Sequence, residues 1–160
     1  MIMVSDQPLL LDFIKVCIRM PQDERDQLEA FTGVPYDIDG AAIGNFTTTG
    51  PKWVLRVDNE PICVGGFVLQ RPGVYRDFML NTPEAFEQHW FGVTRIARRA
   101  MNAMFLSKTA HRLECIAPAQ RLSARPQLEN WYRILGYKKE SVLQAYCANR
   151  YDAVMFARIS

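Results

Sequence analysis

The residues that could bind a transition metal or act as reactive thiols are few and far apart in this sequence. No two cysteines form the Cys-x-x-Cys pair that structural zinc sites use, and only two histidines are available. Each cysteine has apolar neighbours, as is typical of reduced thiols inside a cytosolic protein. We therefore expect free cysteines and no metal site. The residues concerned are Cys17, Cys63, Cys115, Cys147, His89 and His111.

Positive charge gathers in the second half of the chain, although the net charge is only +2. Residues 95–125 hold seven basic side chains against Glu114 alone, whereas residues 1–60 hold ten acidic and five basic ones. Such a stretch could attract a phosphorylated ligand or nucleic acid, or it could be a solvated helix face with a few loop arginines. No exposed aromatics alternate with the arginines and no known nucleic-acid-binding module is present, so nucleic-acid binding ranks last.

Length and composition indicate one folded domain over residues 1–160. The chain has 160 residues and a hydrophobic fraction of 49%, enough for a packed core. Its longest apolar stretch, Leu9–Met20, is interrupted by Asp12, Lys15 and Arg19 and is shorter than the roughly 20 residues that span a bilayer. The first residues show no basic segment followed by an apolar one, so we expect no signal peptide and an intracellular protein.

The first half of the chain predicts two helical segments and a hairpin. Residues 9–20 could form a strand or a helix. Pro21 begins a helix that Gly33 ends, and residues 34–51 form mostly loop, with a short helix at 38–46. Two β-rich runs, 53–57 and 62–70, flank a polar turn, and 74–80 forms a third strand. Gly65 and Gly66 in the second run indicate a bulge or a close backbone approach.

The second half predicts a long crossover. Thr82, Pro83 and Glu84 begin a helical segment that runs to about Ser107, with a break at Gly92. A strand at 111–118, a basic loop at 119–126, a helix from Pro126 to Gly136 and two strands at 137–142 and 151–159 follow. The fold class is α/β, with a central mixed sheet that is largely antiparallel. One parallel crossover places 111–118 beside 74–80.

This order of elements, together with the sequence WYRILGYKKE at 131–140, resembles the GNAT superfamily of N-acetyltransferases. A late helix in that family ends in an aromatic–Tyr–x–x–x–Gly–aromatic pattern, which Trp131, Tyr132, Gly136 and Tyr137 match. The resemblance covers nearly the whole chain. Residues 12–31, 52–67 and 77–89 are also similar to small GNAT-like proteins of tailed bacteriophages, some of which are associated with the virion.

The resemblance implies an acetyl-CoA site between the third strand and the long helix. The family binds the pyrophosphate with an Arg/Gln-x-x-Gly-x-Gly/Ala loop, whose backbone N–H groups surround the phosphates. Here residues 81–89 contain no glycine, and Glu84 and Glu87 would repel an anion; Gln88 and His89 are the nearest polar side chains. The pantetheine arm would pair with the backbone of Met79 and Leu80, and Arg125 stands where the family often has a cofactor-binding asparagine.

The resemblance also implies the two proton-transfer groups. Tyr132 matches the tyrosine that protonates the leaving thiolate, a role that suits a phenol with a pKa near ~10; a tyrosine packed in the core is the alternative. Asp77 on the third strand is the candidate general base, and strand alternation could point it into the cleft or toward solvent.

Two functions follow from the resemblance. The first is an acetyl-CoA-dependent N-acetyltransferase that acts on an unidentified amine. The second is a catalytically inactive bacteriophage protein that keeps the fold and serves in binding or assembly with virion proteins, in the host cytoplasm or the virion. Residues 34–51 contain no diagnostic pocket for the amine. Fold alone does not decide between the two functions, because function depends on the site.

Overall fold

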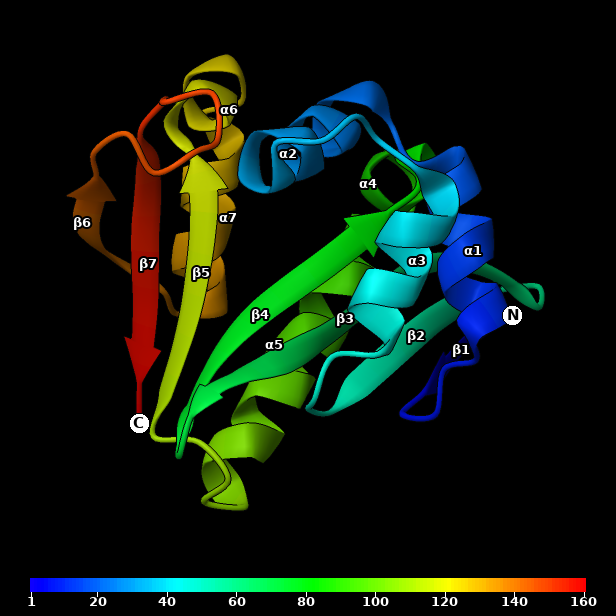
Figure 1. Ribbon diagram of the computed structural model, residues 1–160. Coiled ribbons are helices and arrows are strands. Elements are labelled where there is room, and N and C mark those ends of the chain that lie inside the picture. The colour runs from blue at the N-terminus through cyan, green and yellow to red at the C-terminus, as the bar shows by residue number, and fades with distance from the viewer.

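The computed structural model describes all residues 1–160. Seven strands form one sheet in the order β1-β2-β3-β4-β5-β7-β6 (Figure 1). Every neighbouring pair is antiparallel except β4 and β5, which are parallel, as the sequence predicts. The strands are β1 (Ile2–Ser5), β2 (Lys52–Val57), β3 (Glu60–Arg71), β4 (Val74–Asn81), β5 (Arg112–Pro118), β6 (Lys138–Leu143) and β7 (Ala153–Ile159).

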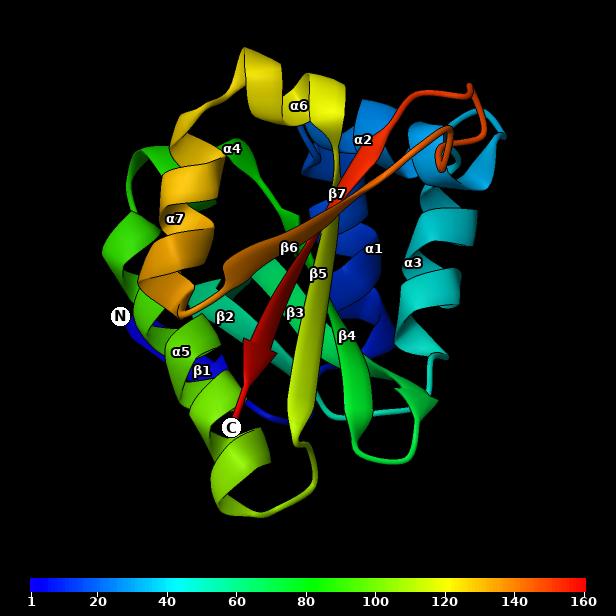
Figure 2. The same ribbon diagram turned by 90° about the vertical axis from the view of Figure 1, so that its left-hand side faces the viewer.

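Helices cover both faces of the sheet. Figure 2 shows α5 and α7 on one side of it and α1 and α3 on the other. We call these the α5 face and the α1 face. None of the helices has the length and apolar character needed to cross a membrane. The helices are α1 (Leu10–Arg19), α2 (Gln22–Thr32), α3 (Ile38–Phe46), α4 (Pro83–Glu87), α5 (Trp90–Leu106), α6 (Ala119–Ala124) and α7 (Gln127–Leu135).

The hydrophobic core is divided by the sheet. A cluster of 23 buried residues lies on the α5 face, and a cluster of 8 lies beneath α1 and α3. Because successive side chains of a strand point to opposite faces, the central strands β2, β3 and β4 each contribute to both clusters. On β4, Met79 packs against the larger cluster and Leu80 belongs to the smaller one. Consecutive residues of β4 therefore reach different environments, which matters for the site below.

Local sequence signals explain the hairpin and the helix ends. Asp58 and Asn59 both have positive φ angles, 49° and 69°, which two-residue hairpin turns require. Gly65 lies against the Trp53 ring, where a Cβ atom would come within 2.4 Å of it. The close approach predicted at Gly65 is confirmed. Gly33 and Gly136 end α2 and α7 in the left-handed conformation.

At one place the structure decides between two alternatives that the sequence left open, and at three places it differs from the prediction. Residues 9–20 form a helix rather than a strand, because Phe13, Val16 and Cys17 recur at helical spacing on the buried side. The predicted break at Gly92 is wrong: α4 ends before Gln88, and Val93 N–H already bonds to the His89 carbonyl.

The basic loop predicted at 119–126 is also wrong. Residues 119–124 form α6, which turns Leu122 into the core and follows directly from Pro118. The short edge strand β1 was not predicted at all. It pairs with β2 through Ile2–Ser5, and its side chains are exposed or half-buried, so it lacks the apolar run that marks a buried strand.

The sheet opens between its two parallel strands. Pairing between β4 and β5 covers only Val74–Arg76 and Arg112–Glu114. Beyond those residues the strands diverge, and Figure 1 shows them separating toward α2 and α6. The last five residues of β4 therefore have a neighbour strand on the β3 side only. We call this opening the split.

Candidate active site

A cavity of about 540 Å³ occupies the split and reaches both faces of the sheet. Of the 25 residues that line it, 17 are hydrophobic, so it suits a ligand that is largely apolar. Asp77, Met79 and Tyr132 line it on the α5 face, and Arg76 and Phe78 do so on the α1 face. Because β4 and β5 diverge, a single cavity has two sides that are lined by different residues.

Asp77 and Tyr132 belong to a buried cluster on the α5 face. The Tyr137 hydroxyl donates a hydrogen bond of 2.6 Å to Asp77 Oδ2. Tyr132 is 7% exposed, and its ring packs on Trp131 and Phe156. The Cys115 thiol interacts with both Asp77 and Tyr132. Of the two directions left open for Asp77, the structure shows the inward one.

Burial sets the protonation of this cluster. Desolvation raises the pKa of Asp77 to about 6, although the hydrogen bond from Tyr137 acts in the opposite direction. Desolvation also raises the pKa values of Tyr132, Tyr137 and Cys115 well above their ordinary values. At neutral pH the cluster therefore combines one carboxylate that gains a proton easily with two neutral phenols that can donate one.

The end of β4 offers one free backbone position to the cavity. Asn81 N–H donates to Glu24 Oε2 at 3.1 Å, on the split side, whereas Thr82 N–H bonds to the Ile62 carbonyl of β3. Because backbone groups alternate along a strand, Met79 faces the split and Leu80 faces β3. The predicted backbone pairing is therefore available at Met79, while the backbone of Leu80 is used within the sheet.

A buried polar network spans the top of the split from α6 to α2. Glu24 of α2 also accepts from Asn81 Nδ2 at 3.1 Å and from Arg121 Nη2 at 3.2 Å. Arg121 of α6 also contacts Asp23 and Gln27. Desolvation raises the pKa of Glu24, opposed by Arg121 and Asn81. This network was not predicted, and its only sequence signal is an acidic residue on the buried side of α2.

The start of α5 is the position expected to hold phosphates. Gln88 is exposed and His89 half-buried, and neither lines the cavity. Phe91 and Gly92 lie in the first turn of α5, where backbone N–H groups have no acceptor inside the helix. Glu84, one of the two carboxylates expected to repel an anion, forms an ion pair with Arg19 of α1 at 3.0 Å. Glu87 is exposed.

Arg125 lies apart from the cavity. Its guanidinium pairs with Asp23 at 3.1 Å and lines a second hollow, between α2 and α6. The structure thus gathers Asp77, Met79, Leu80 and Tyr132 around the split and leaves Gln88, His89 and Arg125 outside it. All four cysteines are free and buried, as predicted. No group of three or more His, Cys, Asp or Glu side chains could hold a metal ion.

Comparison with solved structures places this architecture among acetyltransferases. No protein-family model matches the chain, and no curated protein matches it in sequence. A GNAT-family acetyltransferase from Bacillus anthracis superposes with a TM-score of 0.71 at 10% identity, over 99% of this chain and 94% of that one.

Two similar structures contain the coenzyme. RimL, a ribosomal L7/L12 alpha-N-protein acetyltransferase in complex with coenzyme A, superposes with a TM-score of 0.72 at 12% identity, over 99% of this chain and 93% of that one. The microcin C7 self-immunity acetyltransferase MccE, in complex with acetyl-CoA and AMP, gives 0.72 at 13% identity, over 99% and 92%. At such low identity the likeness concerns architecture alone. The chain has the fold of the GNAT acetyltransferases.

Proposed function

We propose that the protein is an acetyl-CoA-dependent N-acetyltransferase. The observation that carries the proposal is the convergence of a titratable carboxylate, a neutral phenol and a free strand backbone on one cavity. These are Asp77, Tyr132 and Met79, and all three line the split. The fold is shared with acetyltransferases whose structures contain coenzyme A or acetyl-CoA, which supports the same class of acyl donor here.

The two proton transfers fit the protonation of the cluster. Asp77, with its pKa raised to about 6, is mostly ionised at neutral pH and can accept the proton that an attacking amine releases. Tyr132 keeps its proton, because its pKa is raised, and can donate it to the departing thiolate. Both groups are buried, which strengthens their electrostatic effect on the reacting atoms.

The cavity fits the acyl-pantetheine part of acetyl-CoA better than it fits the phosphates. The backbone of Met79 would hold the pantetheine amides, and the apolar lining suits its carbon chain. The first-turn N–H groups of α5, with Gln88 and His89 nearby, would hold the pyrophosphate. When bound, acetyl-CoA supplies the thioester that the amine attacks.

The alternative is a catalytically inactive protein of this fold that serves in binding or assembly, such as a virion-associated bacteriophage protein. Two observations favour it. Glu24 already occupies the Asn81 N–H at the end of β4, and residues 81–89 lack the glycines that let backbone surround a pyrophosphate. Its partners would be virion proteins rather than an amine.

Calorimetric and thermal titration with acetyl-CoA separates the two functions. A donor that binds only the folded state raises its stability, by about 2.7 kcal/mol at a hundredfold excess over Kd. We expect saturable binding and release of free coenzyme A when an amine panel is added. Absence of binding at millimolar acetyl-CoA would leave the assembly role as the better account.

A further inference from the structure

Side-chain atoms without hydrogen-bond partners gather at the cavity. Arg76 Nε, Asn81 Oδ1 and Arg121 Nε are buried and have no partner, and all three residues line the cavity. Buried polar atoms in proteins almost always have a partner. Two of these atoms are guanidinium N–H donors, so the missing partner is an acceptor, and a negatively charged one binds best.

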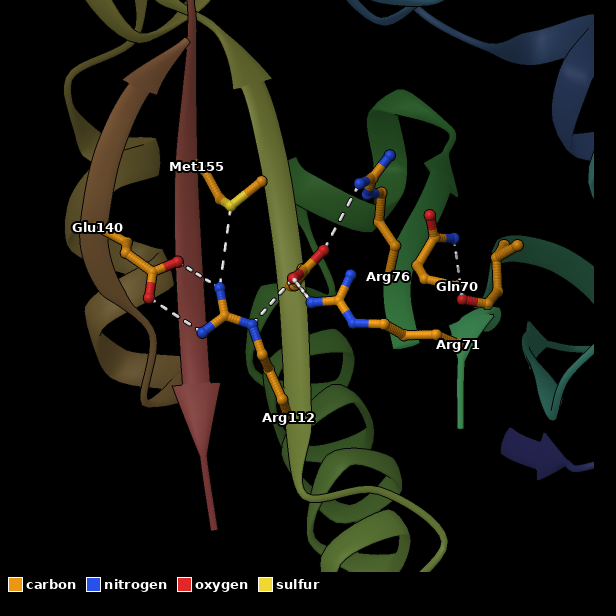
Figure 3. Close-up of polar contacts among 8 residues, drawn as sticks. Gln70, Arg71, Arg76, Arg112, Glu140 and Met155 are labelled. Atoms are coloured by element: carbon orange, nitrogen blue, oxygen red, sulfur yellow. Dashed lines mark hydrogen bonds and ion pairs between the residues drawn. The ribbon is translucent and has the colours of Figure 1, made fainter. Parts of the chain in front are cut away.

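Arg76 has the greater unused capacity of the two arginines. Its contact with Glu114 Oε2 is 3.5 Å long, whereas Arg112 holds Glu114 Oε1 at 2.8 Å. Figure 3 shows the Arg76 guanidinium turned away from Arg71 and Arg112. Glu114 is thus satisfied mainly by Arg112, and Arg76 keeps most of its donors for another anion.

The charges on this part of the α1 face are unequal. The positive groups are Arg71, Arg76 and Arg112, and the negative ones are Glu114 and Glu140. One positive charge is left over. Arg121 and Arg125 add no further charge, because Asp23 and Glu24 neutralise them, but the Nε–H of Arg121 also lacks a partner. An anionic ligand would balance this side of the cavity.

Apolar side chains also contribute to the same side of the cavity. Leu28 and Phe31 of α2, Phe78 of β4 and Ile116 of β5 line it, and Tyr146 stands edge-on to Phe31 with ring centroids 6.3 Å apart. An apolar or aromatic group would therefore fit beside the anion. Glu24 is the acidic side chain of α2 that lines the cavity, and it is not free to bind a cation because it accepts hydrogen bonds from Arg121 and Asn81.

The positions of Arg76 and Asp77 relate the anion to the amine. They are consecutive on β4 and point to opposite faces, and the cavity in the split reaches both. A single ligand that contacts both residues in this cavity needs a nitrogen for Asp77 and an anionic group for Arg76, on either side of the open edge of β4. An α-amino acid has that arrangement, whereas a polyamine or a protein N-terminus lacks the adjacent carboxylate.

We infer that the acceptor is a free amino acid with an apolar or aromatic side chain, and that Arg76 binds its carboxylate. This inference names the substrate of the proposed acetyl transfer and rests on that function. Arg76 is the residue that would make the protein prefer a carboxylated amine to an otherwise similar neutral one.

Binding of phenylalanine and of phenylalaninamide, measured by calorimetry without acetyl-CoA, tests the inference. The two ligands share the side chain and the α-amino group, and the amide lacks the charged carboxylate. We expect phenylalanine to bind about 10- to 100-fold more tightly, the worth of hydrogen bonds to a charged group. Arg76→Gln should abolish the difference, and Arg76→Lys, which keeps the charge, should restore part of it. Arg71→Gln, in the same charge cluster but 66% exposed and outside the cavity lining, should keep the difference.

The outcomes separate this inference from the proposed function. Equal binding of the two ligands by the wild type, or a preference that persists in Arg76→Gln, would overturn the carboxylate site. Phenylalanine that binds through Arg76 without being acetylated would leave the site standing and remove the acetyl transfer. Should Arg76→Gln fail to fold, the Arg76→Lys and Arg71→Gln pair still reports whether the preference depends on Arg76.

Discussion

Arg56 and Arg76 lie on the same face of the sheet and are satisfied very differently. Arg56 forms two parallel contacts with Asp12, of 3.0 and 2.5 Å, and both side chains are largely buried. Arg76 has one contact of 3.5 Å and a buried Nε without a partner. The first arginine completes the packing of α1 on the sheet. The second is held in place with donors unused, as expected of a residue that binds a ligand.

The same contrast separates the two regions around these arginines. Beneath α1, Asp12 also accepts the Leu9 N–H at 2.7 Å, so the start of the helix is tied to the sheet. At the split, the polar atoms of Arg76, Asn81 and Arg121 are incompletely paired. Substitutions beneath α1 should therefore cost stability, and substitutions at the split should cost binding or turnover.

The largest effect is expected from Tyr132→Phe at the split. Removal of the hydroxyl should lower acetyl transfer by about 10²- to 10⁴-fold, the usual worth of a positioned proton donor. The ring stays packed on Phe156, so stability should fall by about 1 kcal/mol at most. Steady-state kinetics and urea unfolding of the same preparation measure both quantities. A Phe variant that acetylates at the wild-type rate would show that Tyr132 is only a packed core residue.

Beneath α1, Asp12→Ala should have the opposite pattern. The substitution leaves the largely buried guanidinium of Arg56 without its partner, and removing one partner of such a pair lowers the free energy of unfolding by about 3–5 kcal/mol. Urea unfolding measures the loss, and acetyl-CoA affinity should be unchanged under native conditions. Lys15→Ala is the matched control, because its ion pair with Glu60 is exposed and should contribute less than about 1 kcal/mol. Equal losses in the two variants would contradict the comparison.

Asp77→Asn should remove a pH dependence of stability. The folded pKa of about 6 lies above the ordinary 3.8, so the folded state binds more protons between these values. The wild type should therefore lose stability as pH rises through this range, by about 3 kcal/mol from this group, and the Asn variant should not. Wild-type turnover should rise over the same range, because the base must be ionised. Parallel stability curves for the two proteins would show that Asp77 titrates normally.

The smallest effect is expected from Tyr137→Phe. The Tyr137 hydroxyl bonds to Asp77 and lowers its pKa, so its removal should raise that pKa further. The acidic limb of the pH–rate profile should move to higher pH, and stability should fall by about 1 kcal/mol. A profile that stays in place would mean that the acidic limb belongs to another group.

The sequence predicts most of the fold because the relevant signals are local. The backbone preferences of Pro21 and Gly33 determine the two ends of α2. Those of Asp58 and Asn59 determine the hairpin turn between β2 and β3. The helix α6 was missed because its evidence is tertiary: Leu122 is buried only when the chain returns to the sheet. The break before α5 lies at Gln88 and His89, where the sequence has neither glycine nor proline to mark it.

The site was less predictable than the fold. Asp77 and Tyr132 follow from the resemblance, but the two sides of the split depend on contacts between distant residues. Glu24 meets Asn81 across 57 positions, and Arg125 turns to Asp23 across 102. No local pattern gives such pairings, which is why the ion pair of Arg125 with Asp23 was not predicted. Arg76 had no sequence signal beyond its place on a strand.

The end of β4 has a consequence for hydrogen exchange. The Asn81 amide is held by Glu24, so its hydrogen should exchange only when that part of the structure opens. The Met79 amide faces the split without a partner strand and should exchange rapidly from the closed, native structure. A molecule lying along β4 would slow the second amide and leave the first unchanged. Deuterium uptake at these two neighbouring positions would therefore report occupancy of the split even for a ligand that never reacts.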